Sequence, residues 1–202
     1  MKKILCALLA VLMMMSIVGC STESAKFDAG KVVGNVYTNE YAGLTFTAPD
    51  GWTFASDEEI ADLMGISMDL VTENEAAQKI AELTTVYGMM AKSADQLSNV
   101  QVVFENTALS GSKLSAEEYV EIIASQLDTV YDDFGATYEA SDIRTIKIGA
   151  NEYIYMDIFV DLGGVVLEQG YACRKVDSKY MANIVITAYE EGGAAALLEC
   201  FN

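Results

Sequence analysis

The stretch NEYIYMDIFVDLGGVVLEQGYACRKVDSKYMANIVITA, residues 151–188, decides the fold of this 202-residue chain. Segments rich in apolar and aromatic residues alternate in it with short turn sequences. Gly163-Gly164 and Asn151 are hairpin turn signals, and Asp177-Ser178 is a weaker one. Strands joined by such short turns must run antiparallel. Together with the residues just before it, the stretch predicts four consecutive antiparallel strands, over residues 137–148, 152–161, 164–175 and 179–188.

Helix signals and further strands precede this stretch. Ser56-Asp57-Glu58-Glu59 and Ser115-Ala116-Glu117-Glu118 are capping boxes, in which a serine and a glutamate bond each other's backbone N–H at a helix start. Gly135 stands where a glycine is expected to end the second helix. Strands and helices are segregated into blocks, which predicts an α+β fold: an antiparallel β-sheet with helices packed on its faces. The other predicted elements are a hairpin over 36–48, helices from Ser56 to Gly65, over 68–83, from Ser115 to Gly135 and over 190–201, and strands over 86–92 and 99–106.

The strand predicted at 152–161 carries apolar bulk on both of its faces. One interpretation is a central strand that helices cover on both sides. The other is a tyrosine-lined groove with acidic residues at its edge. The residues of this candidate binding face are Tyr153, Tyr155 and Asp157, joined by Tyr171 or Tyr180 from the neighbouring strands.

The opening of the main region has a motif of its own, Tyr37-x-Asn39-x-Tyr41-x-Gly43-Leu44-x-Phe46-x-x-Pro49-x-Gly51-Trp52. It resembles the start of Mog1/PsbP-like domains, and the order of elements is similar over residues 36–202. The resemblance implies an α/β/α sandwich. Such domains occur in many small exported proteins, including lipoproteins of Gram-positive bacteria, and the characterised ones act largely as protein-binding or assembly modules. A fold does not carry a function with it, so no binding residue is transferred.

The N-terminus has the pattern of an export signal. Lys2 and Lys3 precede an apolar run over residues 4–18, as in a secretory signal peptide. The run is shorter than the roughly 20 residues of a membrane-spanning helix, which favours cleavage over an uncleaved membrane anchor. Ile17-Val18-Gly19-Cys20 resembles the lipobox of bacterial lipoproteins, which implies a diacylglyceryl group on Cys20. The predicted divisions are a signal peptide over 1–19, a lipidated flexible tether over 20–35 and one domain over 36–202.

The chain is acidic, with a formal net charge of −18. Loss of residues 1–19 would remove Lys2 and Lys3 and leave 30 acidic and 10 basic residues. Nucleic acid is bound by neutralising phosphates with Lys and Arg, so no nucleic-acid partner is expected. The sequence has no histidine, which excludes Ser-His-Asp and Cys-His catalysis and His-ligated zinc or haem. No cofactor and no metal are predicted.

Two cysteines lie in the predicted domain, Cys173 in a strand and Cys200 in the last helix. An exported domain permits a disulfide between them. The alternative is two buried free thiols, which behave as small hydrophobic residues. Their spacing fits no metal or redox motif.

These observations favour a non-enzymatic interaction or accessory module at the extracytoplasmic face of the cell membrane, with a protein partner near the membrane surface. The alternative is a small-ligand or cation-binding lipoprotein, because Asp132-Asp133 and Glu190-Glu191 pair acidic residues, although no calcium-loop motif is present. A third hypothesis is a hydrolase that uses paired carboxylates. Nothing in the sequence brings one such pair together.

Overall fold

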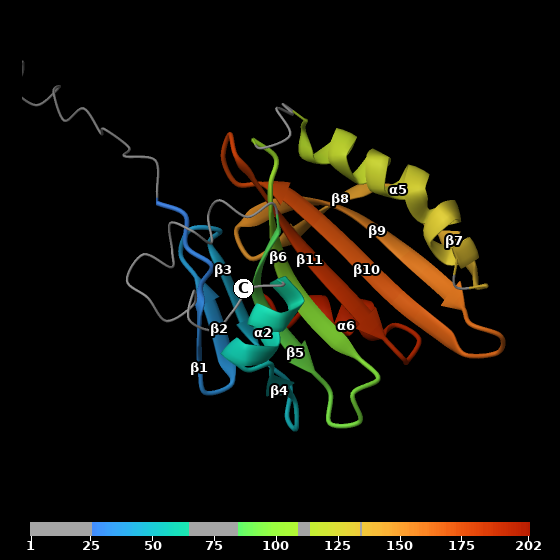
Figure 1. Cartoon of the computed structure of the whole chain (residues 1–202), viewed down its shortest axis with the longest axis horizontal. Helices are drawn as coiled ribbons and strands as arrows, with labels where there is room; N and C mark the ends of the chain where they lie inside the picture. Colours follow the sequence, from blue (N-terminus) through green and yellow to red (C-terminus); the bar gives the residue numbers. More distant parts are fainter. Residues whose placement is uncertain (1–25, 65–84, 109–113, 134) are drawn as a thin grey trace, which may run out of the picture.

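The computed structural model describes residues 26–64, 85–108, 114–133 and 135–202. A large antiparallel sheet forms its centre, and a smaller sheet packs against one face (Figure 1). The large sheet contains β4 (Thr53–Phe54), β5 (Thr85–Lys92), β6 (Asn99–Asn106), β7 (Thr137–Ala140), β8 (Arg144–Ile148), β9 (Asn151–Asp161), β10 (Val166–Lys175) and β11 (Tyr180–Ala188). Its strand order is β4-β5-β6-β11-β10-β9-β7, and β8 also pairs with β9. These antiparallel pairings, with helices packed against them, confirm the predicted α+β class.

The strands β9, β10 and β11 are those predicted from residues 151–188. The single strand predicted over 137–148 is wrong, because two strands form there, β7 and β8, which pair with opposite halves of β9. Ala140 lies opposite Ile158, and Arg144 lies opposite Tyr155. Three residues, 141–143, therefore stand where β9 has only two. An extra residue of this kind makes a β-bulge, which bends the edge strand.

Three helices are described: α2 (Asp57–Met64), α5 (Ala116–Asp133) and α6 (Gly193–Leu198). Both predicted capping boxes form. The Ser56 N–H donates to Glu59 Oε2 at 2.8 Å, and the Glu59 N–H donates to Ser56 Oγ at 3.3 Å. At α5 the corresponding distances between Ser115 and Glu118 are 2.8 and 3.1 Å. Gly135 has a φ of +63°, as its place after α5 predicts. The helix predicted over 68–83 lies outside the described residues.

The small sheet has the order β1-β2-β3, with β1 at Lys31–Val33, β2 at Val36–Asn39 and β3 at Leu44–Thr47. The hairpin predicted over 36–48 is β2 and β3. The C-terminal residues extend this sheet, because the Thr45 N–H donates to Asn202 O at 2.9 Å and Phe201 bridges to Phe46. The predicted helix over 190–201 accordingly ends early, and its last residues pair with β3 instead.

The predicted flexible tether over 20–35 differs from the structure where the structure describes it. Residues 31–33 form β1, and the Phe27 ring stacks on Tyr180 with 4.3 Å between ring centroids. The Tyr37 hydroxyl also donates to Ala29 O at 2.7 Å. The packed domain therefore begins near residue 27, because an aromatic residue and a backbone pairing tie this segment down. Residues 20–25 lie outside the described part.

The large sheet is covered differently on its two faces. The small sheet and α6 bury one face with the larger apolar core, which contains Phe46, Tyr153 and Ile184. The helix α5 covers the other face over β9 and β10, around Met156 and Val160. Among the described residues, none of the helices is both long and apolar enough to cross a membrane.

Candidate functional site

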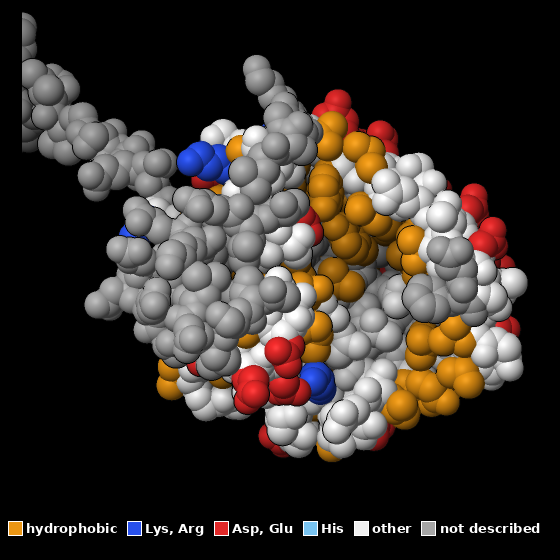
Figure 2. All heavy atoms as spheres, viewed as in Figure 1, with side chains coloured by type: hydrophobic (Ala, Val, Ile, Leu, Met, Phe, Trp, Pro, Cys, Tyr) orange, Lys and Arg blue, Asp and Glu red, His pale blue; other side chains and the backbone are white. Residues whose placement is uncertain are grey.

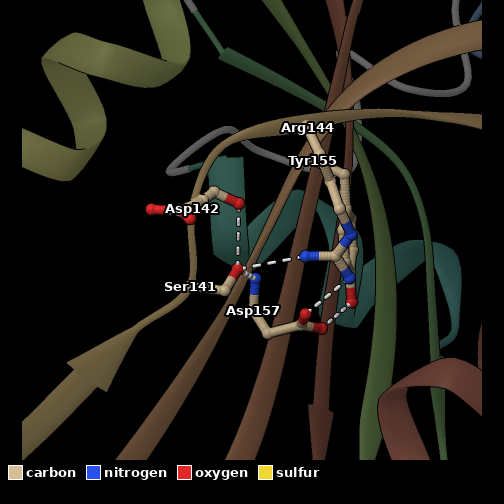
Figure 3. Close-up of polar contacts among 5 residues, drawn as sticks. All are labelled: Ser141, Asp142, Arg144, Tyr155 and Asp157. Carbon is tan, nitrogen blue, oxygen red and sulfur yellow. Dashed lines mark hydrogen bonds and ion pairs between the residues drawn. The ribbon is translucent and has the colours of Figure 1, made fainter.

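A polar cluster lies at the bulge between β7 and β8 (Figure 3). The Ser141 N–H donates to Asp157 O at 2.9 Å, and the Asp157 N–H donates to Ser141 Oγ at 2.9 Å. The serine hydroxyl takes the place of the backbone carbonyl that regular pairing would supply. It also donates to Asp142 O at 3.2 Å. Both backbone N–H groups thus stay paired in spite of the extra residue, as buried and half-buried backbone requires.

Both carboxylate oxygens of Asp157 are engaged. Arg144 Nη2 lies 2.6 Å from Oδ2, and the Tyr155 hydroxyl donates to Oδ1. The Arg144 guanidinium stands 4.7 Å from the centroid of the Tyr155 ring, and its Nη1 donates to Ser141 Oγ at 3.1 Å. Burial, followed by the hydrogen bond to the Asp157 carboxylate, raises the pKa of Tyr155 well above its ordinary value. The phenol is therefore neutral at physiological pH.

The Tyr155 ring reaches this position because Gly170 on β10 has no side chain. A Cβ at Gly170 would lie 2.7 Å from the Tyr155 hydroxyl oxygen and 3.4 Å from the Ala194 Cβ on α6. Tyr155 is only 1% exposed. We call Ser141, Arg144, Tyr155 and Asp157 the edge clasp. The edge clasp joins the bulge to β9. Because the Asp157 carboxylate is held by the Arg144 guanidinium and the Tyr155 hydroxyl, the clasp is suited to fixing the edge strand against β9.

Of the two interpretations of this strand, the tyrosine-lined groove is wrong. Tyr153, Tyr155 and Tyr180 are at most 3% exposed, beneath the small sheet and α6. Tyr171 pairs opposite Met156, so it points to the α5 face instead. A register difference of one residue sends a side chain to the other face of a sheet. Of the five predicted residues, the structure brings Tyr155 and Asp157 together in the edge clasp.

Tyr153 has a structural partner of its own. The Arg174 guanidinium lies 5.5 Å from the centroid of the Tyr153 ring and donates to Ala42 O in the turn between β2 and β3. This contact links the two sheets. The first half of β9 is therefore covered on both faces, as the covered-strand interpretation expects. That interpretation is wrong in two details, because the small sheet together with α6 covers the Tyr153 face and because β9 lies next to the sheet edge.

Cys173 and Cys200 are free thiols. Cys173 is buried on the α5 face, and Cys200 packs on the opposite side with the larger core. The sheet separates them, so the disulfide alternative does not form. Burial raises the pKa of the Cys173 thiol to about 12, which keeps it protonated. Cys20 lies outside the described residues.

Beyond the edge clasp, the same face of β9 opens to solvent. Phe159 is 41% exposed. The register places Glu139 and Glu168 on either side of Phe159, and Thr137 and Val166 on either side of Asp161. We call these six residues the Phe159 surface. Five of them line a shallow concavity of about 280 Å³, and Glu168 stands beside it.

Glu168 is the buried member of the Phe159 surface. It is 7% exposed, and its Oε2 has no hydrogen-bond partner. Sequence reasoning missed Glu168 and Glu139, together with Ser141 and Arg144 of the edge clasp. Only the strand register brings them beside β9, and no local motif marks it. Within the described ranges, no three His, Cys, Asp or Glu side chains are grouped so that they could hold a metal ion.

No family model matches the sequence, and the comparison with curated proteins finds no match. Among solved structures, the chain is similar to the solution structure of cyanobacterial PsbP (CyanoP) from Synechocystis sp. PCC 6803. The two share 12% sequence identity with a TM-score of 0.49, over 87% of this chain and 97% of that chain. The α+β class itself rests on the strand pairing described above, and no site residue is transferred from CyanoP.

Proposed function

We propose that this chain is an exported lipoprotein, tethered through Cys20 to the extracytoplasmic face of the cell membrane, whose domain is a non-enzymatic protein-interaction module. The observation that carries the proposal is the N-terminal sequence, with Lys2 and Lys3, the apolar run and Ile17-Val18-Gly19-Cys20. A single acyl chain binds a membrane only marginally, whereas two chains on one cysteine give a stable anchor.

The packing of Phe27 supports a position close to the membrane. Seven residue steps separate Cys20 from Phe27, whose ring already stacks on Tyr180. At about 3.3–3.6 Å per residue, this connection spans at most ~25 Å. The domain would then sit at or just above the lipid surface, which favours a partner in or beside the same membrane.

Exposed apolar side chains support an interaction role. Among the described residues, four of the eleven exposed large apolar side chains lie on the β9–β10 hairpin: Phe159, Leu162, Val165 and Val166. Figure 2 shows hydrophobic side chains gathered over the tip of this hairpin, at the lower right. A concentration of exposed apolar side chains on one element favours association with another protein. The edge clasp, with both Asp157 oxygens engaged, favours a structural role over chemistry at that site.

Replacement of the lipidated cysteine tests the tether. We expect Cys20→Ser to move the protein from the membrane fraction to the soluble extracytoplasmic fraction, and we expect the mass of the wild-type N-terminal peptide to include a diacylglyceryl group. Cys6→Ser, which lies within the predicted signal peptide, is the matched control and should stay in the membrane. Unmodified Cys20 in the wild-type protein would contradict the tether. The interaction role predicts that the wild type, solubilised in mild detergent, migrates in a complex with another protein.

A further inference from the structure

We infer that the Phe159 surface binds a lysine or arginine side chain that the protein partner presents. This inference rests on the proposed function and names the surface and the partner chemistry. Phe159 lies between two cross-strand neighbours, Glu139 of β7 and Glu168 of β10, and the three residues form one row across the sheet. The face of an aromatic ring attracts a cation. Carboxylates on both sides of that ring strengthen the attraction for the same charge.

Glu168 points independently to a ligand. Its side chain is 7% exposed and one of its oxygens lacks a hydrogen-bond partner. Charged groups in protein interiors are ordinarily paired, because an unpaired one has lost its hydration without compensation. An ammonium or guanidinium group above Phe159 would lie beside this carboxylate, which is the cross-strand neighbour of the ring, and would offset part of its charge. The next row adds Asp161, of which Oδ1 already accepts from the Gly164 N–H at 2.6 Å.

Among the described residues, no lysine or arginine forms an ion pair with the acidic residues of this surface. In the part of the chain that the structure describes, the ion pairs are Lys92 with Glu59 and Arg144 with Asp157. Neither involves Glu139, Asp161 or Glu168. On this proposal the complementary charge comes from a partner. The exposed Leu162 and Val165 beside this surface would contact apolar neighbours of that basic residue.

The position of the hairpin suits such a partner. Phe27 enters the domain at Tyr180, the first residue of β11, whereas Glu168 lies opposite Ala188, the last. Eight residue steps along a strand cover about 26 Å. Figure 1 shows the N-terminal segment and the β9–β10 hairpin at opposite ends of the sheet. The tethered end and the binding end are thus separate, and the hairpin is free to meet an extracytoplasmic segment.

Site-specific photocrosslinking in the intact cell tests the inference. A benzophenone side chain replaces Leu162 in the full-length protein, and in separate strains it replaces Ile122 on α5 or Val33 on β1, which are also exposed. We expect a protein adduct from position 162, and we expect its mapped partner peptide to contain a Lys or Arg beside apolar residues. Phe159→Leu removes the ring and keeps the apolar bulk. It should lower the adduct yield about fivefold to tenfold, as loss of a partly desolvated cation–π contact predicts.

Matched charge variants complete the test. Glu139→Gln should lower the yield several-fold, whereas Glu121→Gln, which neutralises an exposed acid on α5, should leave it unchanged. Equal yields from the wild type, Phe159→Leu and Glu139→Gln would overturn the inference, and so would a mapped peptide without a basic residue or an adduct to a second copy of the chain. Protein adducts from positions 122 or 33 alone would reject this surface and leave the interaction module standing. Absence of protein adducts from all three positions would reject the proposed function itself.

Discussion

The two halves of β9 each place aromatic residues followed by an aspartate on the same face, but they have opposite surroundings. In the first half, Tyr153 and Tyr155 are each 1% exposed, and Asp157 is paired with Arg144. In the second half, Phe159 is 41% exposed, and no described cation pairs with Asp161. The helix α6 reaches Gly170, opposite Asp157, because a Cβ there would lie 3.4 Å from the Ala194 Cβ, and the Phe159 surface begins in the next row.

This difference shows what period-2 alternation means in a sheet. In a strand, every second residue points to the same face of the sheet, so the alternation of residue types predicts which side chains share a face. Whether the face is covered depends on elements far away in the sequence, here β1–β3 and the C-terminal residues. One strand therefore supplies core in its first half and a candidate binding surface in its second half.

The largest expected difference between the two halves of β9 is the loss of stability when an aromatic ring is removed. Tyr155→Ala should lower the free energy of unfolding by about 3–5 kcal/mol, because it removes a fully buried ring and leaves a cavity. Phe159→Ala removes a similar ring from the open half, and its cost should stay below about 1 kcal/mol. Urea unfolding followed by circular dichroism measures both. Similar losses for the two variants would show that the halves do not differ in burial.

The edge clasp should show the next largest contrast. Asp157→Ala leaves the buried Tyr155 hydroxyl without its acceptor, which should cost about 1–3 kcal/mol. The Arg144 side chain is 47% exposed, so the ion pair itself should contribute only ~0.2–1 kcal/mol. A double-mutant cycle of Asp157→Ala with Arg144→Ala separates the two contributions. Asp161→Ala is the control in the open half, and a loss as large as that of Asp157→Ala would break the comparison.

Alkaline pH tests the burial of Tyr155 in the first half of β9 without removing side-chain volume from the core. Burial and the neighbouring carboxylate raise the pKa of Tyr155 above the ordinary value of about 10. Above that ordinary value the unfolded chain releases the proton and the folded chain keeps it, so the stability present below pH 10 is lost as the pH rises. Tyr155→Phe removes this loss. Between pH 8 and pH 11 we expect the wild type to lose about 1 kcal/mol more than the variant, as measured by urea unfolding, and parallel losses would contradict the assignment.

The sequence predicts the local elements of this protein better than their mutual arrangement. The capping boxes at Ser56 and Ser115 and the hairpin over 36–48 depend on residues within a few positions of each other, and all three form. The bulge at Ser141 depends on how the edge strand matches β9. The face of Tyr171 depends on register, and the burial of Tyr153 depends on a separate sheet. No local motif marks the edge clasp or the Phe159 surface, because the residues of each come from separate strands and meet only when those strands are aligned.

The smallest expected effects are in the open half, where stability and binding should separate. Glu139→Gln replaces an exposed carboxylate by an amide of the same shape, so the free energy of unfolding should change by less than about 0.5 kcal/mol. Binding of a basic partner should weaken in the same variant, and it should weaken further in the wild type as salt is raised, because exposed charges are screened over about 10 Å at 0.1 M. Thermal unfolding measures the first property, and the photocrosslinking yield from position 162 measures the second. A large loss of stability in Glu139→Gln would mean that the Phe159 surface supports the fold as the edge clasp does. An unchanged melting temperature with a reduced, salt-sensitive yield is expected only if the second half of β9 is left uncovered for a partner.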